Sequence, residues 1–311
     1  MSNRVPMHLA FVAAVVLMAT PQTALAQLDQ AGSWAAFVAN EYRVEPNVTY
    51  LVANDRKNKV DLYVPENAGG PTPVLMYIHG GGWRQGSKES YVLRVLPYLE
   101  MGWAVVNVQY RLSQVSQAPA AVEDCLCALR WIIRNADEYN FDPSRIVVTG
   151  QSAGGHLTLT TGMIPASAGL DRRCPGTEEL RVAAMINWYG VTDVADLLEG
   201  PNMTTWGVSW FGSRSDRKEL AKRVSPLTYV RPGLPPVFTV HGDADPAVPH
   251  DHAVRLHAAL DGVGVPNEFH TVQGGGHGRF NREEMLEIYG KIHRFLAANG
   301  FSTEGSTSQQ Q

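Results

Sequence analysis

Several functional classes are excluded by what this 311-residue chain lacks. It has no block of lysine and arginine, and its formal net charge is only −4, so nothing indicates a nucleic acid or an anionic membrane as a partner. It has no Walker loop, no GxGxxG spacing after the first parallel strand and no HExxH helix. No pair of histidines has supporting carboxylates at metal-ligand spacing. The sequence therefore predicts neither a cofactor nor a metal.

Long apolar runs are also scarce, and the one at the N-terminus has the pattern of an export signal. The run from His8 to Thr20 follows the positive charge of Arg4 and precedes Ala24-Leu25-Ala26, the small-x-small pattern that signal peptidase cleaves. It is shorter than the roughly 20 residues that span a bilayer, which disfavours the alternative of a membrane anchor. We therefore expect residues 1–26 to be a cleaved signal peptide, and the mature protein to be periplasmic or secreted, beginning at Gln27.

Cysteine is rare, with Cys125, Cys127 and Cys174 only. Export to an oxidising compartment favours a disulfide, and the odd count leaves one thiol over. Cys125 and Cys127 are two residues apart on a predicted helix, where their side chains diverge, so they are not expected to pair with each other. We expect Cys174 to pair with one of them, and the sequence leaves open which one. The alternative is three buried thiols, because a buried cysteine packs as a small apolar residue.

The chain is 44% hydrophobic and 18% charged, which is enough apolar material for one full core. Apolar, strand-like runs occupy residues 74–78, 103–108, 145–149, 182–188, 237–240 and 269–272, and helical stripes occupy residues 120–139, 251–260 and 283–298. This alternation predicts an α/β domain over residues 27–301, with a mainly parallel sheet covered by helices on both faces. Residues 48–52 and 59–64 flank a polar turn and predict an antiparallel hairpin at the sheet edge. The polar tail, residues 302–311, is predicted to be disordered.

One segment, Thr192 to Val230, interrupts this alternation and is too long for a simple crossover. We expect it to form a helical insertion over the carboxyl edge of the sheet, where ligands bind in folds of this kind. Trp206 and Trp210 of this segment, together with Trp83, are candidate substrate contacts. The alternative, that the aromatic residues of the insertion only pack it onto the sheet, stays open.

Two glycine-rich motifs follow predicted strands. Gly150-Gln151-Ser152-Ala153-Gly154 lies between a strand and a helical pattern, which is the GxSxG context of a nucleophilic serine. Small flanking residues let strand and helix approach closely, and the helix N-terminus supplies positive potential. His79-Gly80-Gly81-Gly82 ends the first parallel strand, and its glycines leave backbone amides uncovered. We expect the amides of Gly81, Gly82 and Ala153 to form an oxyanion hole.

A base and an acid follow Ser152 in chain order. Asp243 and Asp245 come directly after the fifth parallel strand, and His277 lies in a glycine-rich loop after the sixth. A base must accept the serine proton, and an acid must hold the imidazole in the correct tautomer. The pattern predicts a Ser152–Asp245–His277 triad. Asp245 is favoured over Asp243 because a loop beyond the strand can reach the base.

Together these motifs resemble the carboxylesterase branch of the α/β-hydrolases that carries an HGGG oxyanion loop, which includes hormone-sensitive-lipase-like and bacterial feruloyl-esterase-like members. The similarity runs from about Val48 to Leu296 and includes Gln109-Tyr110-Arg111-Leu112 and Glu123-Asp124. Gln151 stands where lipase-like members often have aspartate, and Trp83 after the glycines is closer to the feruloyl-esterase-like members. The resemblance implies an α/β-hydrolase fold with a helical insertion over the active site, and the same triad and oxyanion hole.

The resemblance further implies a serine esterase. Its substrates would be small-molecule carboxylic esters with short acyl groups, or plant-derived esters such as acetyl and feruloyl esters, cleaved through an acyl-enzyme. A second hypothesis is an exopeptidase or amidase similar to the prolyl-peptidase relatives, which an accessory propeller domain would support. A third is a binding protein on a hydrolase scaffold, because fold alone does not fix function. The complete triad disfavours the third.

Overall fold

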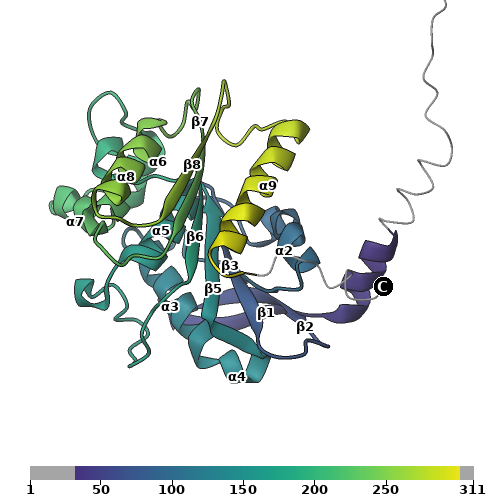
Figure 1. Cartoon of the computed structure of the whole chain (residues 1–311). Coiled ribbons are helices and arrows are strands. Elements are labelled where there is room, and N and C mark those ends of the chain that lie inside the picture. Colours follow the sequence, from purple (N-terminus) through teal and green to yellow (C-terminus); the bar gives the residue numbers. More distant parts are fainter. Residues whose placement is uncertain (1–31, 302–311) are drawn as a thin grey trace, which may run out of the picture. The chain divides into compact units, whose positions relative to one another are not determined.

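The computed structural model describes residues 32–301 (Figure 1). The chain divides into two units after residue 40, and the described part of the first unit, residues 32–40, is helical. The predicted signal peptide and the predicted polar tail both lie outside the described residues. Between residues 32 and 301, no helix combines the length and the apolar character needed to cross a membrane.

An eight-stranded sheet forms the centre of the second unit, in the order β1-β2-β4-β3-β5-β6-β7-β8. The strands are β1 (Tyr42–Ala53), β2 (Arg56–Pro65), β3 (Thr72–Ile78), β4 (Ala104–Val108), β5 (Phe141–Gln151), β6 (Ala184–Trp188), β7 (Val237–Gly242) and β8 (Asn267–Val272). The strands from β4 through β8 pair in parallel, whereas β1 and β2 pair antiparallel and occupy one edge. The predicted parallel sheet and its edge hairpin are confirmed.

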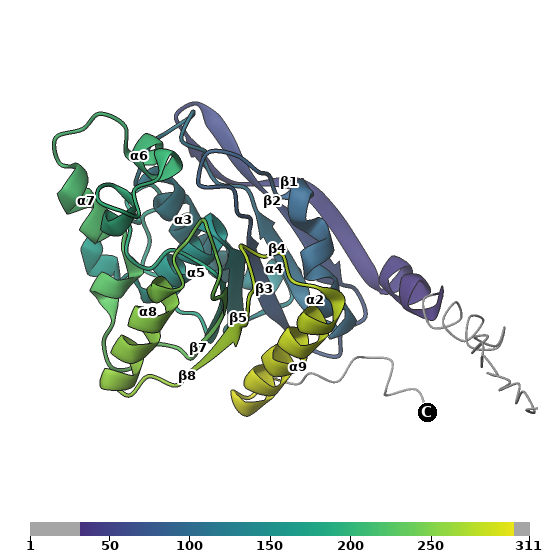
Figure 2. The same ribbon diagram turned by 90° about the horizontal axis from the view of Figure 1, so that it is seen from above.

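Helices cover both faces of this sheet. They are η1 (Glu89–Val95), α2 (Leu96–Glu100), α3 (Ala120–Arg134), α4 (Ala136–Tyr139), α5 (Ala153–Met163), η2 (Ala166–Ala168), α8 (Asp251–Gly262) and α9 (Arg282–Ala298). Two views show α3, α5 and α8 on one face and α2 and α9 on the other (Figures 1 and 2). The predicted stripe of α3 is buried at each position, and the helix is interrupted at Asn135 rather than continuous to Tyr139.

The interruption between β6 and β7 is helical, as predicted. It contains η3 (Ala195–Leu197), α6 (Thr205–Phe211), α7 (Arg217–Arg223) and η4 (Pro226–Tyr229). Helix α6 begins where it does because the Thr204 side chain accepts a hydrogen bond from the Gly207 amide at 3.0 Å, satisfying a donor that the helix itself leaves free. Trp210 and Phe211 at its end are fully buried, which anchors the insertion to the core.

A buried ion pair joins α3 to the segment after β4. The Arg111 guanidinium donates to both carboxylate oxygens of Asp124 at 2.7 to 2.9 Å, and the Arg111 amide donates to the same carboxylate at 2.8 Å. Both side chains are completely shielded from solvent. Because so many donors meet the carboxylate, the charge of each partner is compensated, which fixes the segment that follows β4 against the first turns of α3.

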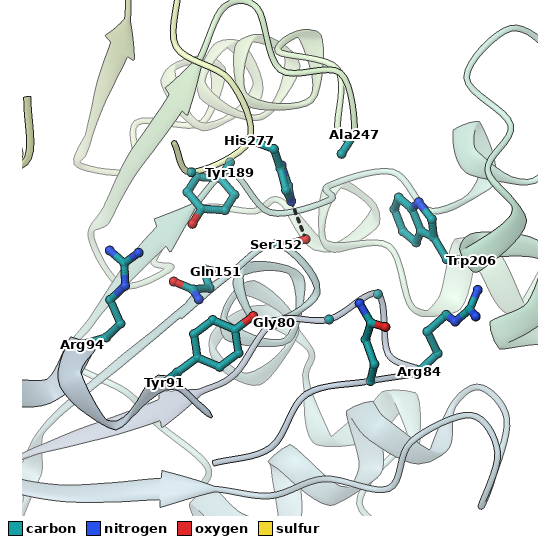
Figure 3. A pocket seen from close by; sticks show the side chains of 14 residues that line it. Gly80, Arg84, Tyr91, Arg94, Gln151, Ser152, Tyr189, Trp206, Ala247 and His277 are labelled. Atoms are coloured by element: carbon teal, nitrogen blue, oxygen red, sulfur yellow. Dashed lines mark hydrogen bonds between the residues drawn. The ribbon is translucent and has the colours of Figure 1, made fainter. Parts of the chain in front are cut away.

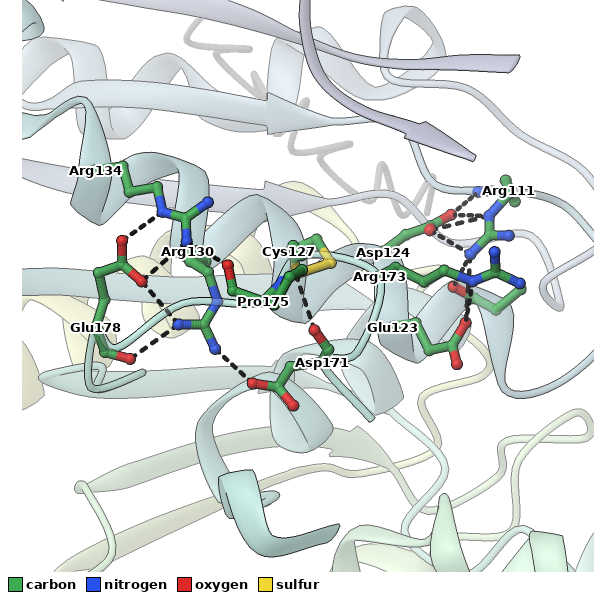
Figure 4. Close-up of a disulfide and its surroundings, with 12 residues drawn as sticks. Arg111, Glu123, Asp124, Cys127, Arg130, Arg134, Asp171, Arg173, Pro175 and Glu178 are labelled. Atoms are coloured by element: carbon green, nitrogen blue, oxygen red, sulfur yellow. Dashed lines mark hydrogen bonds and ion pairs between the residues drawn. A yellow bond between two sulfur atoms is a disulfide. The ribbon is translucent and has the colours of Figure 1, made fainter. Parts of the chain in front are cut away.

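The same helix holds a disulfide that ties it to the loop between α5 and β6. Cys127 is bonded to Cys174, and Cys125 is a buried free thiol (Figure 4). The expected pairing of Cys174 with one of the two helix cysteines is therefore present in the structure. On the same helix, Arg130 forms ion pairs with Asp171 and Glu178 of this loop, so covalent and ionic contacts hold the loop together.

We expect loss of this disulfide to lower stability. The bond links residues separated by 47 positions and so restricts the unfolded chain. Removing such a cross-link lowers the free energy of unfolding by about 2–4 kcal/mol, because the denatured state gains conformational entropy. Urea unfolding of a Cys127→Ser/Cys174→Ser variant should show this loss, and reduced wild-type protein should match the variant. The Cys125→Ala variant is the control, since it retains the disulfide and its unfolding should still respond to reductant. Three titratable thiols in unreduced, denatured protein would contradict the assignment.

Candidate active site

Ser152 occupies a sharp turn between β5 and α5. Its backbone has φ 57° and ψ −119°. This conformation is energetically unfavourable for any residue that has a Cβ atom. The turn is also crowded, because a Cβ added at Gly154 would lie 2.1 Å from the Ile78 carbonyl oxygen. Only glycine allows α5 to pass this close to β3. The strain and the crowding together position the Ser152 hydroxyl at the carboxyl end of β5.

Three loops bring Ser152, His277 and Asp245 into one hydrogen-bonded series. His277 Nε2 lies 2.8 Å from Ser152 Oγ, and His277 Nδ1 lies 2.7 Å from Asp245 Oδ2. Figure 3 shows the His277 ring directed at the serine hydroxyl. In this arrangement Nδ1–H donates to the carboxylate, which leaves Nε2 free to accept a proton from Ser152. The side chains come from the ends of β5, β7 and β8.

Asp245 is held as a buried carboxylate. One of its oxygens accepts the amides of Ala247 at 2.7 Å and Val248 at 3.0 Å, and the other lies 3.3 Å from His241 Nε2. Burial raises the pKa of Asp245, but the hydrogen bonds from His241 and His277 lower it by more, so the pKa lies below its usual range. The carboxylate is therefore ionised at neutral pH and can stabilise an imidazolium.

The other candidates from the sequence have different partners. Asp243 is exposed and accepts the Gly274 amide at 2.6 Å, so it supports the loop that carries the base. His156 is buried in α5, where it accepts the Trp83 indole N–H at 3.2 Å and contacts the Val224 carbonyl at 2.7 Å. Burial lowers the pKa of His156 to about 4, so this ring is a neutral packing element.

The loop after β3 presents free amides beside Ser152. The Gly81 carbonyl accepts the amides of Arg84 at 3.2 Å and Gln85 at 3.1 Å, which closes a turn with φ 117° at Gly81. A Cβ there would lie 2.0 Å from the Gln85 carbonyl oxygen, so only glycine fits. Within residues 32–301, the amides of Gly81, Gly82 and Ala153 donate no hydrogen bond. All three are therefore available to a developing negative charge.

These groups surround a pocket of about 580 Å³. Its lining consists of Gly80, Gly81, Gly82, Arg84, Gln85, Tyr91, Arg94, Gln151, Ser152, Tyr189, Trp206, Ala247, His277 and Gly278. The lining residues follow β3, β5, β6, β7 and β8 and include α6 of the insertion. The insertion therefore reaches the carboxyl edge of the sheet, as the sequence predicts.

Of the three tryptophans predicted as substrate contacts, only Trp206 lines the pocket. The prediction is wrong for Trp83 and Trp210, which are completely buried and stack on each other with ring centroids 4.0 Å apart. The physical reason is that the buried Trp210 ring of α6 packs against Trp83, whereas Trp206 of the same helix lies 5.4 Å from the Trp83 ring and also reaches the pocket. Packing therefore accounts for Trp210, and a substrate contact by Trp206 stays a prediction.

The residues at the other side of the pocket carry no motif in the sequence and were not predicted. Tyr91 and Arg94 come from η1, a segment without a clear helical or strand pattern, and Tyr189 follows β6 with φ 40°. Only their position in the chain could have indicated a role in the site. The segment after the HGGG loop and the residue after β6 both lie next to the carboxyl edge of the sheet, where ligands bind in such folds.

In sequence and in overall fold, this chain is similar to known esterases. The family model described as BD-FAE matches residues 60–260. Esterase LipQ of Mycobacterium tuberculosis is 32% identical over 232 residues, which is 70% of this chain and 54% of LipQ. Carboxylesterase NlhH of the same organism is 30% identical over 234 residues, 69% of this chain and 70% of NlhH. A truncated carbohydrate esterase from gut microbiota superimposes with a TM-score of 0.71 at 27% identity, covering 83% of this chain and 98% of that structure. The chain spans about half the length of the first curated relatives it matches.

Proposed function

Because this chain belongs to the BD-FAE family of α/β-hydrolases, we propose that it is a serine hydrolase that cleaves carboxylic esters through an acyl-enzyme. The observation that carries the proposal is the hydrogen-bonded series Ser152–His277–Asp245, which opens into a pocket beside three free amides. Relatives that bear the names esterase and carboxylesterase, and a structural neighbour described as a carbohydrate esterase, support the same reaction class.

In the proposed reaction, Ser152 Oγ attacks the ester carbonyl carbon while His277 Nε2 accepts the hydroxyl proton. Asp245 stabilises the imidazolium, and the three amides receive the oxyanion of the tetrahedral intermediate. His277 then gives its proton to the departing alcohol, which leaves an acyl group on Ser152. A water molecule, deprotonated by His277, attacks this acyl-enzyme, and the carboxylic acid leaves as the serine hydroxyl is restored.

The proposed substrates are esters with short acyl groups, or plant-derived esters such as acetyl and feruloyl esters. The pocket of about 580 Å³ and the indole of Trp206 at its wall support a limit on the group that enters. Because one methylene changes binding by only about 1–3 kcal/mol, the preference should be graded rather than absolute. A p-nitrophenyl ester series, compared with methyl ferulate, acetylated xylan and an aminoacyl-anilide, tests both the class and the preference. Hydrolysis of the anilide alone would contradict the proposal.

Trp206 and Trp210 provide a matched pair for the role of the insertion. We expect Trp206→Ala to move the chain-length profile towards longer esters with a small change in melting temperature, because its ring lines the pocket. Trp210→Ala should instead destabilise the fold by about 3–5 kcal/mol and leave the profile in place, because its ring is fully buried. Both variants need the same two measurements, thermal unfolding and turnover of two- to sixteen-carbon esters. An unchanged profile for Trp206→Ala would refute the pocket argument.

The proposed export of the protein rests on the signal-like sequence of residues 1–26. The disulfide between Cys127 and Cys174 supports it, because disulfides persist in oxidising compartments and are rare in the cytosol of most organisms.

A further inference from the structure

The pocket has a positive lining in a protein of net negative charge. Arg84 and Arg94 line it, and none of the described lining residues is an aspartate or a glutamate. The carboxylate of Asp245 is not exposed in the pocket, since it lies behind His277 and is bound there by that ring and by the amides of Ala247 and Val248. A ligand in this pocket therefore meets two guanidinium groups and no opposing acid.

Arg94 is the half-buried member of the two. Within the part of the chain that the structure describes, it forms no ion pair with an aspartate or glutamate. Its polar neighbours are tyrosines instead. Burial raises the pKa of Tyr289, while the charge of Arg94 and a hydrogen bond from it oppose that rise. Burial also raises the pKa of Tyr189, again opposed by Arg94, so both phenols remain neutral around the cation.

A second, smaller hollow adjoins the pocket at the same residues. Arg94 and Gln151 line both, and the hollow is completed by Tyr77, Tyr98, Thr149, Trp188 and Tyr289. Tyr77 is only 3% exposed, and among residues 32–301 its hydroxyl has no hydrogen-bond partner. This hollow has room for only about 10 Å³, so a ligand reaches the groups that line the pocket itself. At this end they are the Arg94 guanidinium, the Gln151 amide and the hydroxyls of Tyr91 and Tyr189, all of which can donate.

We propose that the Arg94 end of the pocket binds a carboxylate carried by the ester substrate. A carboxylate matches this donor set because it can accept two parallel hydrogen bonds from a guanidinium and further ones from hydroxyl groups. The preferred substrates would then be half-esters of dicarboxylic acids, or esters in which a hydroxy acid supplies the alcohol and keeps its own carboxylate free. This inference rests on the proposed ester hydrolysis at Ser152 and adds the charge of the substrate to it.

Arg84 serves as the internal control. It is exposed and lies with Trp206 on the opposite side of Ser152 from Arg94, Tyr91 and Gln151 (Figure 3). An exposed guanidinium is well hydrated and screened by salt, so it should contribute little selectivity.

The test uses two pairs of esters that differ in a carboxylate. Monomethyl terephthalate and methyl 4-methylbenzoate place the charge on the acyl side, whereas 4-acetoxybenzoate and 4-methylphenyl acetate place it on the alcohol side. The kcat/KM ratio of charged to neutral ester is measured for the wild type, Arg94→Met, Arg94→Lys and Arg84→Met. In one of the two pairs, we expect Arg94→Met to lower this ratio by about tenfold to a hundredfold, as for a lost charge-assisted hydrogen bond. Arg94→Lys should lie between, because it retains the charge without the planar fork.

The outcomes separate the two proposals. If the wild type hydrolyses none of the four esters and no p-nitrophenyl ester, the proposed function fails. If the neutral esters are hydrolysed but the ratio is the same in Arg94→Met as in wild type for both pairs, ester hydrolysis stands and the carboxylate site is wrong. A lower ratio of charged to neutral ester in Arg84→Met, together with an unchanged ratio in Arg94→Met, would also overturn the carboxylate site at Arg94. Thermal unfolding of each variant shows that the compared proteins are folded.

Discussion

Replacing Ser152 with alanine should lower kcat for ester hydrolysis by about a millionfold, the usual effect of removing a catalytic nucleophile. Among residues 32–301, the Ser152 hydroxyl has one hydrogen-bond partner, His277 Nε2. The alanine variant thus loses only this contact. The melting temperature should therefore change little. The measurement is the steady-state rate with p-nitrophenyl acetate together with the initial burst of nitrophenol, which should disappear. Near-wild-type turnover by the purified variant would refute Ser152 as the nucleophile.

A second substitution at the same position separates chemistry from backbone strain. Ser152→Gly should be as inactive as the alanine variant but more stable than it, because glycine adopts φ 57° without the cost that a Cβ imposes. Glycine also loses about 0.5–1 kcal/mol more chain entropy on folding than alanine does, so equal stability of the two variants would limit the strain to that amount. The comparison needs only thermal unfolding, since both proteins lack the hydroxyl.

Replacing Asp245 with asparagine should lower kcat by about ten-thousandfold. The side-chain amide of the introduced asparagine can donate to His277 Nδ1, which favours the tautomer with the proton on Nε2. That nitrogen then cannot accept the proton of Ser152, although the geometry of the three side chains is retained. The measurement is the pH dependence of kcat in the variant and the wild type.

Asp243→Asn is the matched control. Asp243 accepts the Gly274 amide and does not contact His277, and an asparagine oxygen can accept the same bond. We expect its kcat to stay close to the wild-type value. A larger loss of activity in Asp243→Asn than in Asp245→Asn would reverse the assignment of the acid.

Much of the fold followed from local patterns. The runs that became β3, β4, β6 and β7 are continuous and apolar because both faces of a parallel sheet are covered, and this signal needs no tertiary information. The edge strand β8 is only partly buried and its run was weaker. The position of Ser152 was equally local, since the turn requires glycine at its flanks. The break in α3 at Asn135 was not visible, because the apolar spacing continues through it.

The partners of these elements were decided by tertiary structure. The sequence left Cys125 and Cys127 as equal candidates, and only the direction of each side chain from α3 separates them. It also could not divide the tryptophans, because burial depends on what packs against each ring: Trp83 and Trp210 stack on each other in the core, whereas Trp206 lines the pocket.

The sequence by itself determined the motifs on which the proposed chemistry rests: a serine on a tight turn, a glycine loop with uncovered amides, and an acid and a base that follow in order. These depend on residue type and on the few residues around each motif. What only the tertiary structure decided is which groups meet across loops that are far apart in the chain: it places Asp245, which the sequence favoured over Asp243, against His277, and it brings Arg94 into the same pocket as Ser152. The physical reason is that hydrogen bonds and charge contacts act over a few ångströms, whereas sequence spacing does not specify distance between loops.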